Sequence, residues 1–399
     1  MDLNESKNAI VYEKVTDYAL FNNRTIEEMV SDISVLKPDI IFRTFWQWNL
    51  IPNSCNDIPA EYKQDCIDTG WNYESLGISI NNIKQELPDS IILGAVPSQI
   101  IRRQTAYNPR TNNMYTYPDT WNMALDPLKW GITTISKTDM QCTLAKSFGW
   151  FPSTQNCSSY DPSTVCCYYP DLTNILYQEI LLSWIYTQID MGIDGIWIDM
   201  FTQQAKMLYT YLKDINHSSI VETTAAMDYI INSIHNYGNL IGRTIYVGTW
   251  ASIVGFNISS NIDFLTISPT SIDVSSMNYN NSEWTQKIDI IRSKYPTTPI
   301  ICFIDWAMDI STPLGQFSQV LTIQQQKDFL TITKQFCEEK TIIPSYPVHG
   351  GWMGDNATKL SYGIRYEYDS KAPEFDTYNI IYSLINNVCS EPICNFILV

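Results

Sequence analysis

The sequence has little histidine, few basic residues relative to acidic ones, and no long apolar run. Only three histidines occur in 399 residues, so a zinc site of ordinary composition is disfavoured and we expect no metal. Lys and Arg total 25 against 42 Asp and Glu, which gives a formal charge of −17 and repels phosphate backbones. We therefore expect no nucleic-acid partner. No run of about 18 apolar residues occurs, so no membrane-spanning helix is expected either.

Cysteine is too sparse for a disulfide scaffold, and no pair has the CxxC spacing of redox and zinc motifs. Three pairs lie in polar stretches typical of loops and are plausible disulfides, namely Cys55 with Cys66, Cys142 with Cys157, and Cys389 with Cys394. Cys302 and Cys337 lie in apolar segments and are expected to be buried thiols. The disulfides favour an extracellular or cell-surface location, although residues 1–10 show no signal peptide.

Short apolar runs of strand length alternate along the chain with longer stretches of helical spacing. This order predicts a parallel sheet with crossover helices. The first helix is expected to begin after Thr25, which forms a capping box with Glu28. Another helix is expected from about Leu172 to Asp190. The eight expected strands cover residues 39–45, 90–96, 165–169, 192–199, 244–250, 263–267, 300–305 and 341–346.

Eight strand–helix units predict one α/β domain over residues 1–399, a (β/α)8 TIM barrel with strands apolar on both faces. Residues 100–164 are too long for an ordinary connection, and we expect an insertion between strands two and three that caps the C-terminal face. A doubly wound open sheet is the alternative. No GxGxxG or GxxxxGK[ST] follows any strand, so neither that fold nor a nucleotide cofactor is favoured.

Function in such a barrel lies at the C-terminal ends of the strands. The two-residue period of a strand places Trp197 and Asp199 on the lumen side and Ile196 and Ile198 toward the helices. The same period directs Asp305 to the mouth from strand seven. Two carboxylates at this face, in a chain with almost no histidine, predict acid–base or nucleophilic chemistry by a carboxyl pair.

The other strand ends carry side chains that suit sugar binding, and the chain has a surplus of aromatic residues, with 25 Tyr, 14 Phe and 12 Trp. Aromatic rings stack on the C–H faces of sugars, and polar groups bind the hydroxyls. The expected substrate-binding residues are Arg43, Trp46, Gln99, Trp197, Trp250, Tyr346 and His349, with Asp171 and Asp273 as further candidates.

The segment from Tyr168 to Met200, YYPDLTNILYQEILLSWIYTQIDMGIDGIWIDM, resembles a segment of (β/α)8 glycoside hydrolases of the alpha-amylase and alpha-glucosidase kind. In that family the final Asp of a GxDGxxxD strand is the nucleophile, so the resemblance implies this role for Asp199. The chain has Trp197 where amylases have Arg, and Phe201-Thr202 where some alpha-glucosidases continue with Asn-Glu. The resemblance implies no particular acid.

These features predict a secreted glycoside hydrolase that acts on an oligo- or polysaccharide with retention of configuration. Asp199 would be the nucleophile and Asp305 the acid/base. The alternative is a catalytically inactive carbohydrate-binding barrel of the cell surface. A phosphosugar isomerase or Schiff-base aldolase is disfavoured, because it needs a strand-end lysine and a stronger phosphate loop than Gly350-Gly351.

Overall fold

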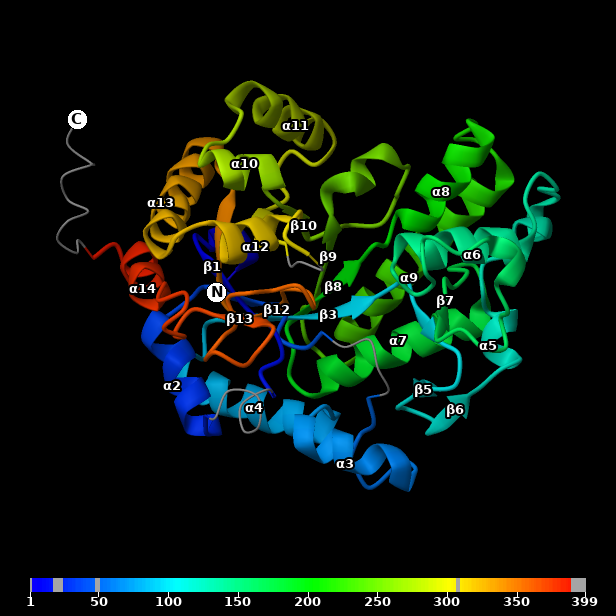
Figure 1. The fold of residues 1–399 in the computed structure, drawn as a ribbon, viewed down its shortest axis with the longest axis horizontal. Helices are drawn as coiled ribbons and strands as arrows, with labels where there is room; N and C mark the ends of the chain where they lie inside the picture. Colours follow the sequence, from blue (N-terminus) through cyan, green and yellow to red (C-terminus); the bar gives the residue numbers. More distant parts are fainter. Residues whose placement is uncertain (1, 17–23, 47–50, 306–308, 389–399) are drawn as a thin grey trace.

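In the computed structural model, which describes residues 2–16, 24–46, 51–305 and 309–388, the chain forms a closed parallel barrel (Figure 1). The strand order is β1-β2-β3-β8-β9-β10-β11-β12, and β12 pairs back onto β1. The expected (β/α)8 TIM barrel is confirmed. Its strands are β1 (Ala9–Tyr12), β2 (Ile40–Phe42), β3 (Ile91–Pro97), β8 (Gly195–Asp199), β9 (Tyr246–Trp250), β10 (Phe264–Ile267), β11 (Ile300–Phe303) and β12 (Ile343–Trp352).

Two strand assignments differ from the sequence-based expectation. The first barrel strand, β1, is absent from the predicted set, because its apolar run is only four residues long. The segment expected as strand three contributes only β7 (Cys167–Tyr168), which pairs antiparallel with β4 (Ile101–Arg102) outside the barrel. The long insertion therefore separates the third and fourth barrel strands. The two differences offset each other, so Asp199 still ends the fourth barrel strand.

Helices lie outside the barrel between the strands (Figure 1). The capping box of Thr25 and Glu28 is present at the start of α2, as expected. The helices are α2 (Ile26–Leu36), α3 (Ala60–Thr69), α4 (Tyr73–Glu86), α7 (Ile175–Asp190), α8 (Gln203–Leu212), α9 (Ser218–Leu240), α10 (Ser271–Ser276), α11 (Asn281–Lys294), α12 (Pro313–Gly315), α13 (Ile323–Lys340) and α14 (Tyr378–Asn386). Across the described ranges, no helix combines the length and apolar character needed to cross a bilayer.

The strands bury apolar side chains on both faces, which explains their continuous hydrophobic runs. Trp197 and Phe303 belong to the cluster inside the barrel, and Ile196 and Ile198 belong to the cluster between strands and helices. The alternation expected for β8 and β11 is therefore confirmed. Gly248 leaves room for a lumen ring, because a Cβ there would lie 2.2 Å from the Phe264 side chain.

The insertion after β3 is built from short elements. They are β4, β5 (Ala106–Asn108), β6 (Asn113–Tyr115), α5 (Asp119–Asn122) and α6 (Lys137–Ser147), followed by β7. The β5–β6 hairpin lies against α7, where the Trp184 indole donates to the Tyr107 carbonyl at 2.7 Å. Figure 1 shows these elements beside α7 and α9. Coverage of the barrel mouth by this insertion stays a prediction.

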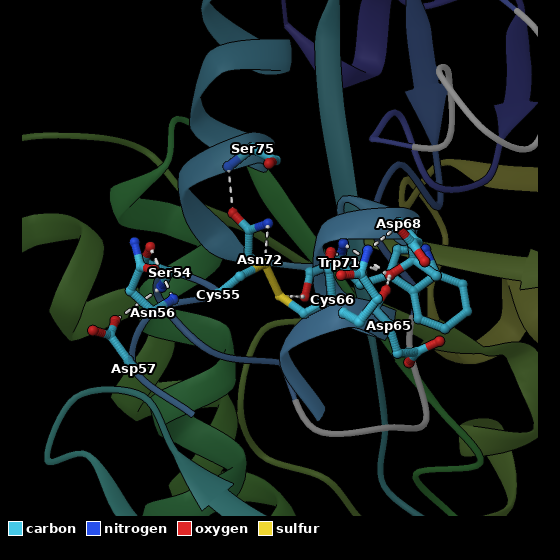
Figure 2. The surroundings of a disulfide bond; sticks show 12 residues. Ser54, Cys55, Asn56, Asp57, Asp65, Cys66, Asp68, Trp71, Asn72 and Ser75 are labelled. Carbon is cyan, nitrogen blue, oxygen red and sulfur yellow. Dashed lines mark hydrogen bonds between the residues drawn. A yellow bond between two sulfur atoms is a disulfide. The ribbon is translucent and has the colours of Figure 1, made fainter. Parts of the chain in front are cut away.

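Two of the expected disulfides are present, Cys55–Cys66 and Cys142–Cys157. Figure 2 shows the first, which joins the loop before α3 to the last turn of that helix. Asn72 lies beside it, donating to the Cys55 sulfur and capping α4 through the Ser75 N–H. Cys302 and Cys337 are buried thiols, as expected. Cys389 and Cys394 lie outside the described residues.

Candidate active site

Asp199 is the last residue of β8 and points into the barrel mouth. Its side chain is buried, and both carboxylate oxygens accept hydrogen bonds. The Gln99 amide donates to Oδ2 at 2.8 Å, and the Trp250 indole donates to Oδ1 at 2.6 Å. Three strand ends therefore fix one carboxylate, because Gln99 follows β3 and Trp250 ends β9.

Burial is the main influence on the pKa of Asp199, and it raises that pKa above the ordinary value. The Trp250 hydrogen bond, the positive charge of Arg43 and the Gln99 hydrogen bond each lower it in part. The indole and amide N–H groups can only donate, so they favour the ionised carboxylate as acceptor. The position suits an ionised group held in a poorly hydrated site, which is what a carboxylate nucleophile requires.

Arg43 follows β2 and lies inside the mouth with almost no exposure. Its Nη2 is 3.0 Å from Oε1 of Glu13, a buried residue that follows β1. The guanidinium also stacks near two indoles, with its central carbon 5.0 Å from the Trp46 ring centre and 5.3 Å from that of Trp197. The Gly351 N–H donates to the other Glu13 oxygen at 2.6 Å. Glu13 is thereby held as the counter-ion of Arg43.

Asp305 follows β11 and reaches the same arginine from the other side. Its Oδ1 is 3.5 Å from Arg43 Nη1, and about a third of its side chain, 33%, is exposed. Its backbone N–H donates to the Ser268 hydroxyl at 3.2 Å. Arg43 is therefore paired with Glu13 and Asp305 and acts electrostatically on Asp199, which brings the two predicted acids into one charge network.

Aromatic rings form the floor of the mouth. Trp197 packs edge-on against Trp250 and Phe303, with ring centres 5.4 and 5.8 Å apart. Trp46 lies 6.0 Å from Trp197. The Trp197 indole donates to the Thr266 hydroxyl at 3.0 Å, so its polar edge is satisfied. The predicted residues Arg43, Trp46, Gln99, Trp197, Trp250, Asp199 and Asp305 are thus gathered at one place.

A cavity of about 580 Å³ opens beside this group at the ends of β8, β9 and β10. Met200, the residue after Asp199, lines it, as do Trp250 and Ser268. Its volume is in the range of small-ligand sites. Among the described residues, no group of three or more His, Cys, Asp or Glu side chains is arranged to hold a metal.

Two aspartates proposed as further binding candidates have structural contacts instead. Asp171 precedes α7 and accepts from Lys129 and Gln204, both at 2.9 Å. Asp273 forms the capping box of α10 with Thr270. Both carboxylates are buried, and each accepts hydrogen bonds from nearby backbone or side-chain donors. Buried polar groups are normally paired in this way.

The two aromatic candidates from the last barrel strand direct their side chains away from the lumen. Tyr346 belongs to the cluster between strands and helices, and burial strongly raises the pKa of its phenol. His349 is buried against Tyr12, with its Nδ1 3.0 Å from Oδ2 of Asp369. Neither placement agrees with direct sugar contact. The pairing of β1 with β12 passes from Val11–Pro347 to Tyr12–His349, so β12 carries Val348 as an extra residue just before His349.

Glu13 is a site residue that sequence reasoning does not find. The residue follows the short β1, and without that strand there is no reason to place Glu13 at the mouth. The apolar run from Ala9 to Tyr12, ended by a charged pair, is the signal available. Trp48 and Trp306, which neighbour predicted site residues, lie outside the described residues.

No protein-family model and no curated protein matches the sequence. Solved structures do match. A type III pullulan hydrolase from Thermococcus kodakarensis is 11% identical with a TM-score of 0.53, over 97% of this chain and 70% of that chain. A cyclic alpha-maltosyl-(1→6)-maltose hydrolase from Arthrobacter globiformis is 8% identical, with a TM-score of 0.49 over 95% and 82%. A debranching enzyme from Nostoc punctiforme is 10% identical, with a TM-score of 0.48 over 97% and 81%. Similarity at these identities establishes a shared fold and no shared activity.

Proposed function

We propose that this protein is a glycoside hydrolase that acts on an oligo- or polysaccharide. The observation that carries the proposal is the placement of Asp199, a buried strand-end carboxylate whose two oxygens accept N–H donors from Gln99 and Trp250. Asp305 supplies a second carboxylate at the same mouth. The barrel shared with a pullulan hydrolase agrees with this chemistry.

In a retaining mechanism, Asp199 attacks the anomeric carbon while Asp305 donates a proton to the leaving oxygen. A covalent glycosyl ester on Asp199 then forms, and Asp305, now ionised, takes a proton from the water that hydrolyses it. The donor-only partners of Asp199 favour the ionised nucleophile. The exposure of Asp305 gives it access to both the leaving group and the water.

A second candidate is a carbohydrate-binding barrel without catalysis. The ion pair between Arg43 and Asp305 favours this alternative, because a nearby positive charge stabilises the ionised form of a carboxylate that should act as an acid. Glu13 opposes this effect by sharing the positive charge of Arg43. The aromatic floor would serve binding equally in both cases.

The experiment is a screen of alpha- and beta-linked oligosaccharides for newly released reducing ends, with Asp199→Asn and Asp305→Asn beside the native chain. We expect hydrolysis by the native chain and loss of at least about 10³-fold in Asp199→Asn. Azide added to Asp199→Ala should form a glycosyl azide of inverted configuration if Asp199 is the nucleophile. Asp289→Asn, which alters an exposed aspartate on α11, is the matched control and should keep full activity.

Binding without release of reducing ends would favour the inactive barrel and reject the hydrolase. Undiminished turnover in Asp199→Asn would reject the role assigned to that residue. The two disulfides suit an oxidising compartment, and we include an extracellular or cell-surface location in the proposal.

A further inference from the structure

The charged side chains that line the cavity near Asp199 all have the same sign. Lys206 on α8 and Lys287 on α11 are the charged side chains that line it, and both are basic. The chain as a whole carries a formal charge of −17, so a cavity wall without a carboxylate departs from the general composition. The cavity is therefore locally electropositive.

Neither ammonium is neutralised by an acidic neighbour. Within the described part of the chain, Lys206 forms no hydrogen bond or ion pair through its side chain, and burial alone lowers the pKa of its ammonium. The Lys287 ammonium lies 4.6 Å from the centre of the Trp284 ring, a contact that leaves its positive charge uncompensated. Both lysines are exposed, and two ammonium groups without an acidic partner at one cavity wall favour an anionic ligand.

The start of α8 adds to this field. Thr202 and Gln203 line the cavity, and Thr202, the N-cap residue, makes no side-chain cap hydrogen bond. Its hydroxyl is instead 2.9 Å from that of Ser252. Because the first residues of α8 line the cavity, the positive end of the helix dipole lies at the same wall as the two lysines.

The cavity lies close to the proposed nucleophile, because Met200, the residue after Asp199, lines it. Trp250 also lines it and donates its indole N–H to Asp199. Trp284 and Ile291 form part of the wall on another side, and both side chains are buried. A ligand in the cavity therefore lies near Asp199.

We propose that this cavity binds a sugar unit that carries an anionic group, so that the natural substrate is an acidic oligo- or polysaccharide. The inference rests on the proposed function and names its substrate class. Lys206 and Lys287 bind the carboxylate or sulfate, and the sugar unit next to the bound one reaches Asp199. Neutral sugars lack the anion and bind more weakly.

The test measures binding by ligand-observed NMR with three monosaccharides that differ at carbon 6, namely D-glucuronate, D-glucose 6-sulfate and D-glucose. The proteins are the native chain, Lys206→Gln, Lys287→Gln and the control Lys213→Gln. Lys213 is an exposed residue at the end of α8, so the control removes the same charge from the same helix. Free sugars contain both anomers, so the linkage need not be known.

We expect an anionic sugar to bind the native chain about 10-fold more tightly than glucose, as a charge-assisted hydrogen bond would give. Lys206→Gln and Lys287→Gln should each lose most of that preference, and Lys213→Gln should keep it. Tighter binding of glucuronate assigns the anion to a uronic acid, whereas tighter binding of glucose 6-sulfate assigns it to a sulfate ester. Both results support the proposal.

Equal binding of glucose and both acidic sugars would overturn it, and so would equal losses in Lys206→Gln and Lys213→Gln. Asp199→Asn separates this outcome from failure of the proposed function. That variant should lose hydrolysis and still prefer the acidic sugar. A chain that binds glucuronate through Lys206 without hydrolysing any glycan would contradict the hydrolase and leave the anionic site supported.

Discussion

The Trp250 indole nitrogen lies 2.6 Å from Oδ1 of Asp199 and joins the ends of two neighbouring barrel strands, β9 and β8. This hydrogen bond opposes the effect of burial, which raises the pKa of Asp199. The balance between the two sets the pKa of the carboxylate. Trp250 is therefore a positioning residue whose role can be read from a pH profile.

Trp250→Phe removes the N–H donor and keeps most of the ring. Because the lost hydrogen bond favours the ionised form, the pKa of Asp199 should rise further. A charge-assisted hydrogen bond of about 1.5 kcal/mol corresponds to about one pH unit. The acid limb of kcat/KM should therefore move to higher pH by about one unit.

Trp130→Phe is the matched control for this profile. The Trp130 indole donates to Glu222 at 2.8 Å, in an exposed pair away from β8. An unchanged acid limb in Trp250→Phe would show that Asp199 does not control the acid side of the profile.

Arg43 stabilises the folded chain as well as the carboxylates of Glu13 and Asp305, with which it pairs. Arg43→Met leaves the buried Glu13 carboxylate without its counter-ion, which should lower the free energy of unfolding by about 3–5 kcal/mol. Arg43→Met combined with Glu13→Gln removes both charges and should recover a large part of that loss. Urea unfolding of the two variants measures the difference, and equal stability of the single and double variants would contradict the ion pair.

Asp369 gives the fold a dependence on acid pH. Hydrogen bonds and charges from His349 and Arg24 overcome its burial and hold its pKa at about 2, below the ordinary value of 3.8. Because the pKa of Asp369 is lower in the folded than in the unfolded chain, its carboxylate stabilises the fold fully at pH values above the ordinary pKa. That stabilisation is lost as the pH falls through the pKa of the folded chain. Between about pH 4 and pH 2 the native chain should lose about 2 kcal/mol more than Asp369→Asn does.

Unfolding at closely spaced pH values measures this loss. Asp289→Asn, which changes an exposed aspartate, should retain the pH dependence of the native chain. The same slope in Asp369→Asn as in the native chain would assign the acid sensitivity to other carboxylates.

The sequence is sufficient to predict the barrel and its two central acids, because alternation along apolar strands is a local property. Ile196 and Ile198 face the helices and Trp197 faces the lumen, because successive side chains of a strand point to opposite faces. The positions of Asp199 and Asp305 follow from the same parity. The short β1 carries too few apolar residues to be recognised, and Glu13 is lost with it.

The surroundings of other candidate residues are set by tertiary contacts. Nothing local in the sequence shows that Gln204 and Lys129 bind Asp171, or that Asp369 holds His349 behind the strand. Asp273 is the exception, since Thr270 three residues earlier forms a capping box that the sequence contains. A strand-end aspartate with such a partner is better interpreted as a helix cap than as a substrate-binding residue.

The Cys142–Cys157 disulfide stabilises the insertion that precedes the fourth barrel strand. Its closed loop spans 15 residues, and chain entropy predicts a loss of about 3 kcal/mol when Cys142→Ser and Cys157→Ser are combined. Gln141 lies next to Cys142 and bonds the Tyr169 backbone at both N–H and carbonyl, so the loss should spread to the segment that leads into α7. Hydrogen exchange at Tyr169 measures this spread.

The matched change of Cys55 and Cys66 should cost a similar free energy and leave exchange at Tyr169 unaltered, because that disulfide lies beside α3 and α4. Equal exchange in both double variants would show that the insertion is held by its hydrogen bonds alone.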